Sequence, residues 1–107
     1  MNQAKRLNKI NHILSRIRNI FLNLEFIPKI VSNEYRDEIN YVFGDLYCIP
    51  QYKNGLGFFI EYAHSHEEAK KHFHGDGDMF PLKMGEDVIL AEIEKEIRQN
   101  MERAIGK

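Results

Sequence analysis

Residues 46–62 read LYCIPQYKNGLGFFIEY, and this stretch predicts a β-hairpin. Its first half is rich in strand-forming residues, although Pro50 indicates an edge strand or the end of the run. An Asn54-Gly55 pair, which is a strong turn signal, separates the two halves. The second half alternates between two faces, with Phe58, Ile60 and Tyr62 on one and Phe59 and Glu61 on the other.

The sequence before this hairpin begins with the clearest helix of the chain, over roughly residues 3–24. Apolar side chains recur there at spacings of three and four, which places them on one stripe of a helix. The stripe consists of Leu7, Ile10, Ile13, Leu14, Ile17, Ile20, Phe21 and Leu24. Pro28 ends or redirects the helix, and residues 29–45 leave the choice between helix and strand open.

The sequence after the hairpin predicts two more helices. Ser65, followed three residues later by Glu68, forms a capping box and predicts a short helix over residues 66–73. Asp76-Gly77-Asp78 predicts a tight turn. A second apolar stripe, opened by two acidic residues, predicts a long C-terminal helix over residues 86–105.

These elements together predict an α+β fold in a single domain, residues 1–107. We expect a long N-terminal helix, a small antiparallel sheet of two or three strands, a short helix and a long C-terminal helix. Helices packed on one face of the sheet would bury both apolar stripes. The chain contains no internal repeat and no linker long enough to separate two domains.

Composition excludes several classes of protein. Of the 107 residues, 43% are hydrophobic and 29% are charged, which is ordinary for a globular domain. Apolar runs reach at most four residues, so we expect no membrane span. The single Cys48 excludes a disulfide scaffold within the chain. No uninterrupted apolar segment follows Met1, so we expect a cytoplasmic protein without a secretory signal.

Charge is distributed unevenly along the sequence. Residues 1–30 contain six basic residues and one acidic residue, a formal charge of +5. Residues 31–107 contain nine basic and 15 acidic residues, a formal charge of −6. The two parts could attract each other within one fold or present opposite charges to partners. The net charge of −1 argues against direct nucleic-acid binding, which would otherwise use Lys5, Lys9, Arg16 and Arg18.

The histidines suggest a metal site as the alternative function. His64, His66, His72 and His74 lie within eleven residues and are followed by Asp76 and Asp78. Zn²⁺ accepts mixed histidine and aspartate ligands, so this segment could serve a small metal-binding protein or a metal-dependent hydrolase. However, His66 and His72 are six residues apart, which is not a shared helical face. We therefore expect no cofactor.

No catalytic set is evident in the sequence. Cys48 lies in a predicted strand and is interpreted as a small buried hydrophobic residue rather than a nucleophile. No serine lies in a Gly-x-Ser-x-Gly setting, and neither glycine-rich phosphate motif is present. We therefore expect a binding protein and not an enzyme.

Three segments carry a resemblance to a known class of proteins. Residues 57–63 (GFFIEYA), 65–71 (SHEEAKK) and 76–82 (DGDMFPL) resemble small bacterial immunity proteins, over roughly residues 46–105. Such proteins are encoded beside polymorphic or contact-dependent growth-inhibition toxins and neutralise them. The resemblance implies a cytoplasmic, non-enzymatic single domain that binds the C-terminal domain of one cognate toxin, and it transfers no set of functional residues.

The predicted function is therefore neutralisation of a toxin domain, most naturally a nuclease, by blocking its active site or substrate surface. Acidic residues of the middle third would complement a basic partner, and nearby aromatic residues would anchor it. The predicted contact residues are Glu61, Glu67, Glu68, Asp76, Asp78, Tyr52 and Phe59. We expect at most weak self-association.

Overall fold

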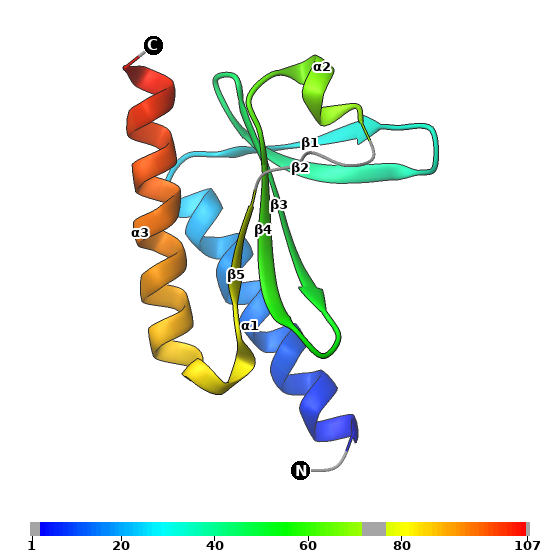
Figure 1. The fold of residues 1–107 in the computed structure, drawn as a ribbon, viewed down its shortest axis with the longest axis vertical. Coiled ribbons are helices and arrows are strands. Elements are labelled where there is room, and N and C mark those ends of the chain that lie inside the picture. Colours follow the sequence, from blue (N-terminus) through cyan, green and yellow to red (C-terminus); the bar gives the residue numbers. More distant parts are fainter. Residues whose placement is uncertain (1–2, 72–76, 107) are drawn as a thin grey trace.

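The computed structural model describes residues 3–71 and 77–106, and these residues form an antiparallel sheet with helices on both faces (Figure 1). The elements are α1 (Gln3–Asn23), β1 (Ile27–Ser32), β2 (Asp37–Phe43), β3 (Leu46–Lys53), β4 (Gly57–Ala63), α2 (His66–Ala69), β5 (Gly77–Phe80), η1 (Leu82–Met84) and α3 (Glu86–Ile105). In the described chain the sheet has five strands in the order β1-β2-β3-β4-β5, so each strand pairs with the next one in the sequence.

The main core lies between the sheet and the two long helices. The buried residues of α1 are Ile10, Ile13, Ile17 and Phe21, and α3 buries Ile89, Leu90, Ile93 and Ile97. From the sheet, Tyr41, Cys48, Phe58, Ile60 and Tyr62 face this core. The predicted stripes of both helices, apart from the exposed Leu7, and the predicted face of the second hairpin strand are thereby confirmed.

A smaller cluster covers part of the opposite face. Val42, Tyr47 and Ala63 lie opposite one another in the β2–β3 and β3–β4 registers, and they pack with Val31 and with Ala69 of α2. Phe59 also faces this side and is partly buried. Both faces of the hairpin are therefore partly covered.

The sequence prediction needs three corrections. Residues 29–45, whose structure was left open, contribute β1 and β2, so the sheet is larger than the predicted two or three strands. The short helix ends at Ala69, before the described residues 70 and 71 of the predicted range 66–73, and residues 72 and 73 lie outside the described part of the chain. Ser65 Oγ accepts a hydrogen bond from Glu68 N at 3.1 Å, as the capping box predicts. Gly77 and Asp78 were predicted in a turn, but they lie in β5 opposite Glu61 and Ile60.

The glycine at position 77 explains the last correction. A Cβ atom there would lie 2.5 Å from Cζ of Phe59 and 2.8 Å from the carbonyl oxygen of Ile60. Only a residue without a side chain lets this short strand approach β4 so closely. The glycine that suggested a turn is therefore a packing requirement of the sheet edge.

The end of α1 sets the direction of β1. Phe26 N donates to Phe21 O and Glu25 N donates to Leu22 O, both at 3.0 Å, which is the Schellman pattern of helix termination. The Phe21 and Phe26 rings meet edge to face at 5.1 Å, the apolar contact that accompanies this motif. Glu25 occupies the left-handed position with φ of 70°, where glycine is usual.

A clamp of charged side chains joins the two long helices. A short hydrogen bond connects the Arg16 guanidinium to Glu86 Oε2, and His12 Nε2 lies 3.1 Å from the same oxygen. The hydrogen bond from Arg16 is the largest cause that lowers the pKa of Glu86, and the charge of His12 adds to it. In this clamp, Arg16 of the basic N-terminal segment attracts Glu86 of the acidic remainder.

Replacing Glu25 by glycine should stabilise the protein. We expect Glu25→Gly to increase the free energy of unfolding by about 1 kcal/mol relative to Glu25→Ala, because only glycine relieves the left-handed strain. Both variants remove a negative charge from the negative end of the α1 dipole, so their difference isolates the backbone effect. Denaturant unfolding measures it, and equal stability of the two variants would contradict the assigned backbone conformation.

Replacing Arg16 should change the titration of Glu86. In Arg16→Ala the pKa of Glu86 should rise toward its ordinary value of 4.5, since the largest cause of its lowering is gone. In the unmodified protein the clamp stabilises the fold fully above that value, and its contribution decreases as the pH falls through the lowered pKa. Carboxyl NMR titration checks the shift, with Arg18→Ala as the control that should leave Glu86 unchanged.

Candidate functional site

The sheet divides into two hairpins that diverge from a common base. Strand β2 pairs with β3 only from Tyr41↔Cys48 to Phe43↔Leu46. Beyond Tyr41, residues 37–40 remain paired with β1, whereas residues 49–53 remain paired with β4. We call the β1–β2 hairpin over residues 27–40 the arm, and the angle between residues 37–40 and residues 49–53 the fork. Figure 1 shows the arm projecting sideways from the rest of the sheet.

Pro50 lies in β3 where the fork opens. A proline cannot donate a ladder hydrogen bond and is tolerated in a sheet where its nitrogen faces no partner strand. Opposite Ile60 on β4 and just beyond the last β2 pair, Pro50 occupies such an edge. The prediction that Pro50 marks an edge strand or the end of the run is therefore wrong as stated, because β3 is the central strand and continues to Lys53; only its part beyond Cys48 lacks a partner on the β2 side.

A cleft of about 760 Å³ occupies the fork. Its walls come from both hairpins and from α1, and they combine apolar and charged side chains: Arg18, Arg36, Asp37, Glu38, Ile39, Tyr41, Ile49, Pro50 and Gln51. Four of these nine residues are charged and four are apolar, a combination that a ligand or partner surface can use.

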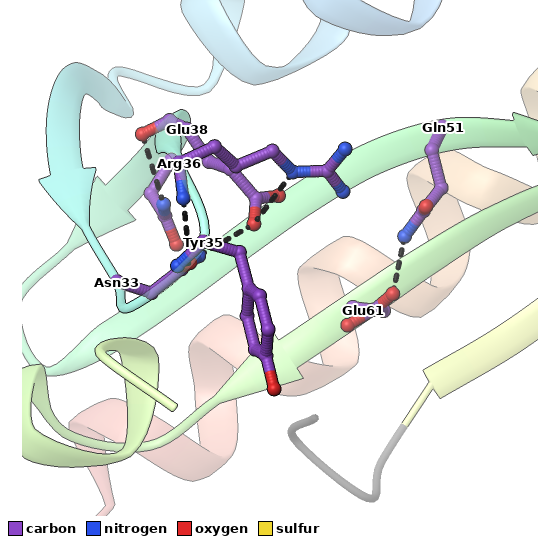
Figure 2. Close-up of polar contacts among 7 residues, drawn as sticks. Asn33, Tyr35, Arg36, Glu38, Gln51 and Glu61 are labelled. Atoms are coloured by element: carbon purple, nitrogen blue, oxygen red, sulfur yellow. Dashed lines mark hydrogen bonds and ion pairs between the residues drawn. The ribbon is translucent and has the colours of Figure 1, made fainter. Parts of the chain in front are cut away.

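The tip of the arm is held by its own side chains. Asn33 Oδ1 accepts hydrogen bonds from the backbone N–H groups of Tyr35 at 2.8 Å and Arg36 at 3.0 Å. Asn33 Nδ2 donates to Glu38 Oε1 at 2.8 Å, and Arg36 Nε lies 3.4 Å from the same oxygen (Figure 2). Next to them Ser32 Oγ donates to Asp37 Oδ1 at 2.6 Å. The tip is therefore a fixed structure, because an asparagine turn and two carboxylates lock it.

The arm exposes apolar side chains that no described element covers. Ile30 and Ile39 lie opposite each other in the β1–β2 register, and their exposed fractions are 71% and 56%. Ile27 and Tyr35, at the base and the tip of the arm, are also largely exposed. The exposed pair of Ile30 and Ile39 on a projecting hairpin makes the arm a candidate interaction surface.

Polar residues line the face of β3 and β4 opposite the long helices. Gln51 donates a short hydrogen bond to the carboxylate of Glu61 across the two strands, as Figure 2 shows. Beside them the Lys53 ammonium lies 4.3 Å from the centre of the Phe59 ring, a cation–π contact. Because Gln51 also borders the fork cleft, this polar face continues into the fork.

Asn40 is the buried polar residue at the base of the arm. Its side chain is only 1% exposed, and Nδ2 donates a long hydrogen bond of 3.4 Å to the carbonyl of Glu38. Within the described chain its Oδ1 atom has no donor. An unpaired buried acceptor costs about 1–3 kcal/mol, so the fold carries a local energetic defect at this point.

The predicted contact residues fall on different surfaces. Glu61 and Phe59 share the face opposite the long helices, and Glu67 and Glu68 lie on α2. Tyr52 lies on the helix side of the sheet, where Arg6 donates to its hydroxyl at 3.0 Å and Phe58 packs edge to face against its ring. The predicted set therefore does not form one patch.

Asp78 also lies on the helix side of the sheet, in β5 opposite Ile60. Burial raises the pKa of the Tyr62 hydroxyl in that core, and the charge of Asp78 adds to the effect. Asp76, the remaining member of the predicted set, lies outside the described residues.

The predicted metal ligands are described only in part. His64 and His66 flank the start of α2, where the His66 ring lies 5.8 Å from the Tyr47 ring. His72 and His74 lie outside the described residues. Among residues 3–71 and 77–106, no three histidine, cysteine or acidic side chains gather closely enough to hold a metal ion.

Cys48 is buried in the main core, as predicted for a small hydrophobic residue. Burial raises the pKa of its thiol far above the ordinary value, so the thiolate form that nucleophilic chemistry needs is disfavoured.

Comparison with other proteins gives no guide to the site: no family model, no curated protein and no solved structure matches this chain. Within the described residues, no helix is both long and apolar enough to cross a membrane. The fork and the arm are therefore interpreted from their own geometry and charge.

Sequence reasoning missed the arm as a candidate site. Two signals were present: residues 27–32 and 37–43 are rich in β-branched and aromatic residues, and Asn33 begins a polar segment between them. Pro28 at the second position of β1 obscured the first strand, since proline demotes a run to an edge strand or to no strand.

Removing the asparagine turn should loosen the arm. We expect Asn33→Ala to destabilise the arm by about 1–2 kcal/mol, because two backbone N–H groups and Glu38 each lose a hydrogen-bond partner. Amide hydrogen exchange in the arm should accelerate by roughly 5–30-fold while α3 stays protected. Glu34→Ala in the same exposed turn is the control and should leave exchange unchanged. Uniform acceleration across the chain would refute a local role.

Proposed function

We propose that this protein binds and neutralises the toxic domain of a bacterial toxin, as an immunity protein, and that the arm and the fork form its contact surface. The cross-strand pair of Ile30 and Ile39 carries this proposal, because it leaves two large apolar side chains in solvent on a hairpin that projects from the core. The resemblance of residues 46–105 to such proteins supports the same conclusion.

Charge around the arm and the fork favours a basic partner, while the fork cleft itself balances Arg18 and Arg36 against Asp37 and Glu38. Residues 33–71 contain seven acidic and four basic residues, and they include the arm tip, the polar face of β4 and α2. A negative surface accelerates the encounter with a positive one. A nuclease fits this description, since an enzyme that holds phosphates presents basic side chains around its active site. Neutralisation would follow from occlusion of that surface, in the cytoplasm where both proteins meet.

The contact is proposed to use side chains rather than strand addition. Two free edges of the described sheet each carry a proline and a lysine: Pro28 and Lys29 on β1, and Pro50 and Lys53 on the free part of β3. Such residues discourage another strand from pairing with the edge. The same feature supports weak self-association at most, so the arm remains available to a different protein.

Removing the isoleucine pair should abolish tight binding. With the toxin domain encoded by the adjacent upstream gene, we expect a nanomolar complex and protection of cells that express the domain. Ile30→Ser combined with Ile39→Ser should weaken the complex at least 100-fold, which is about 2.7 kcal/mol, because two central apolar contacts are lost. Calorimetry and growth protection measure the two effects.

The matched control places the same substitution elsewhere on the surface. Val88→Ser combined with Ile105→Ser on α3 removes apolar side chains that are 49% and 70% exposed, and it should leave the affinity unchanged. If the unmodified protein neither binds nor protects, the immunity function is excluded. If both double variants bind equally well, the arm is not the contact surface.

A further inference from the structure

A second surface feature lies at the opposite end of the molecule, where the start of α1, the β3–β4 turn and η1 meet (Figure 1). Two neighbouring hollows occupy this end, and both are lined by Arg6 and Tyr52. One has a volume of about 380 Å³ and reaches Lys83 and Leu56, and the other has about 520 Å³ and reaches Leu7. We call the pair of hollows the Arg6 groove.

The groove is basic. Arg6 donates one hydrogen bond at 3.0 Å to the Tyr52 hydroxyl, which orients the guanidinium and leaves its other N–H groups available. Lys83 adds a second positive charge from the opposite wall. Among the described residues, no carboxylate lines either hollow.

The groove also has apolar walls. Leu7 on α1 and Leu56 in the β3–β4 turn are 56% and 59% exposed, and each lines one of the hollows. Pro81 and Leu82 continue the wall beneath Lys83. An anion without an apolar part would leave these side chains in water. The groove therefore fits a ligand that carries both a negative charge and an apolar group.

We propose that the Arg6 groove binds an organic phosphate, with the phosphate held by Arg6 and Lys83 and the apolar body against Leu56 and Leu82, which line the same hollow. A phosphate dianion matches two cationic groups, and a guanidinium can grip two of its oxygens at once. This site is independent of the proposed contact with a toxin, because it uses neither the arm nor the fork.

Three small probes test the two halves of the site. We expect phenyl phosphate to shift the amide NMR signals of Arg6, Leu56 and Gly57 saturably in the full chain. Inorganic phosphate should bind at least fivefold more weakly because it lacks the apolar body, and phenol should not bind because it lacks the charge. Affinity for phenyl phosphate should fall as salt is added. Equal shifts with phenol and phenyl phosphate, or no shift with either, would overturn the proposal.

Variants separate the site from general surface charge. Arg6→Met combined with Lys83→Met keeps the apolar stems and should weaken phenyl phosphate binding at least tenfold, whereas Lys95→Met on α3 should not change it. Tyr52→Phe removes the hydrogen bond that positions Arg6 and should cause a smaller loss. Unaltered binding in the double variant, with an unperturbed amide spectrum elsewhere, would refute the assignment. All these variants should retain full affinity for the toxin domain, which keeps this test separate from that of the arm.

Vesicles distinguish the source of the phosphate. Sedimentation of the protein with vesicles that contain phosphatidic acid, and not with neutral phosphatidylcholine vesicles, would identify a lipid headgroup as the natural ligand. Binding of phenyl phosphate without sedimentation would identify a free organic phosphate. In either case Arg6→Met combined with Lys83→Met must lose the sedimentation with vesicles or the binding of phenyl phosphate.

Discussion

Pro50 has no amide hydrogen to donate, and the shape of the sheet follows from that absence. Pairing between β2 and β3 ends just before this residue, at Tyr41↔Cys48. Beyond that point the two hairpins are free to separate, since neither depends on the other for its backbone hydrogen bonds. The arm, the fork cleft and the exposed isoleucine pair all result from this divergence. A continuous ladder would instead have joined residues 37–40 to β3 and closed the cleft.

Two energetic irregularities of the fold lie at the base of the arm. Glu25 holds a left-handed conformation immediately before β1, and its carboxylate lies at the negative end of the α1 dipole. Asn40, in the strand that pairs with β1, buries an acceptor without a donor. Sequences tend to break local rules where function requires it, so two such breaks beside the proposed contact surface agree with its assignment.

The periodicity of apolar residues predicted the helices and strands that have one buried face and one solvent-exposed face. Both long helices, and the alternation of Phe58, Ile60 and Tyr62, could be read directly because burial repeats at a fixed interval along them. The arm could not be read in this way. Its isoleucines are exposed, so no burial pattern distinguishes its two faces, and Pro28 interrupts the run. The turn predicted at Gly77 was wrong for a related reason. The sequence alone does not distinguish a glycine that close packing requires from a glycine in a turn.

The order of the strands has a consequence for the speed of folding. Each strand pairs with its neighbour in the sequence, from β1 to β5, so every ladder of the sheet except that of β4 with β5 closes over only a few intervening residues. Local contacts of this kind lower the entropic barrier to reaching the native state and favour rapid folding. The packing of α3 against α1 and the sheet must wait until the C-terminal segment is made.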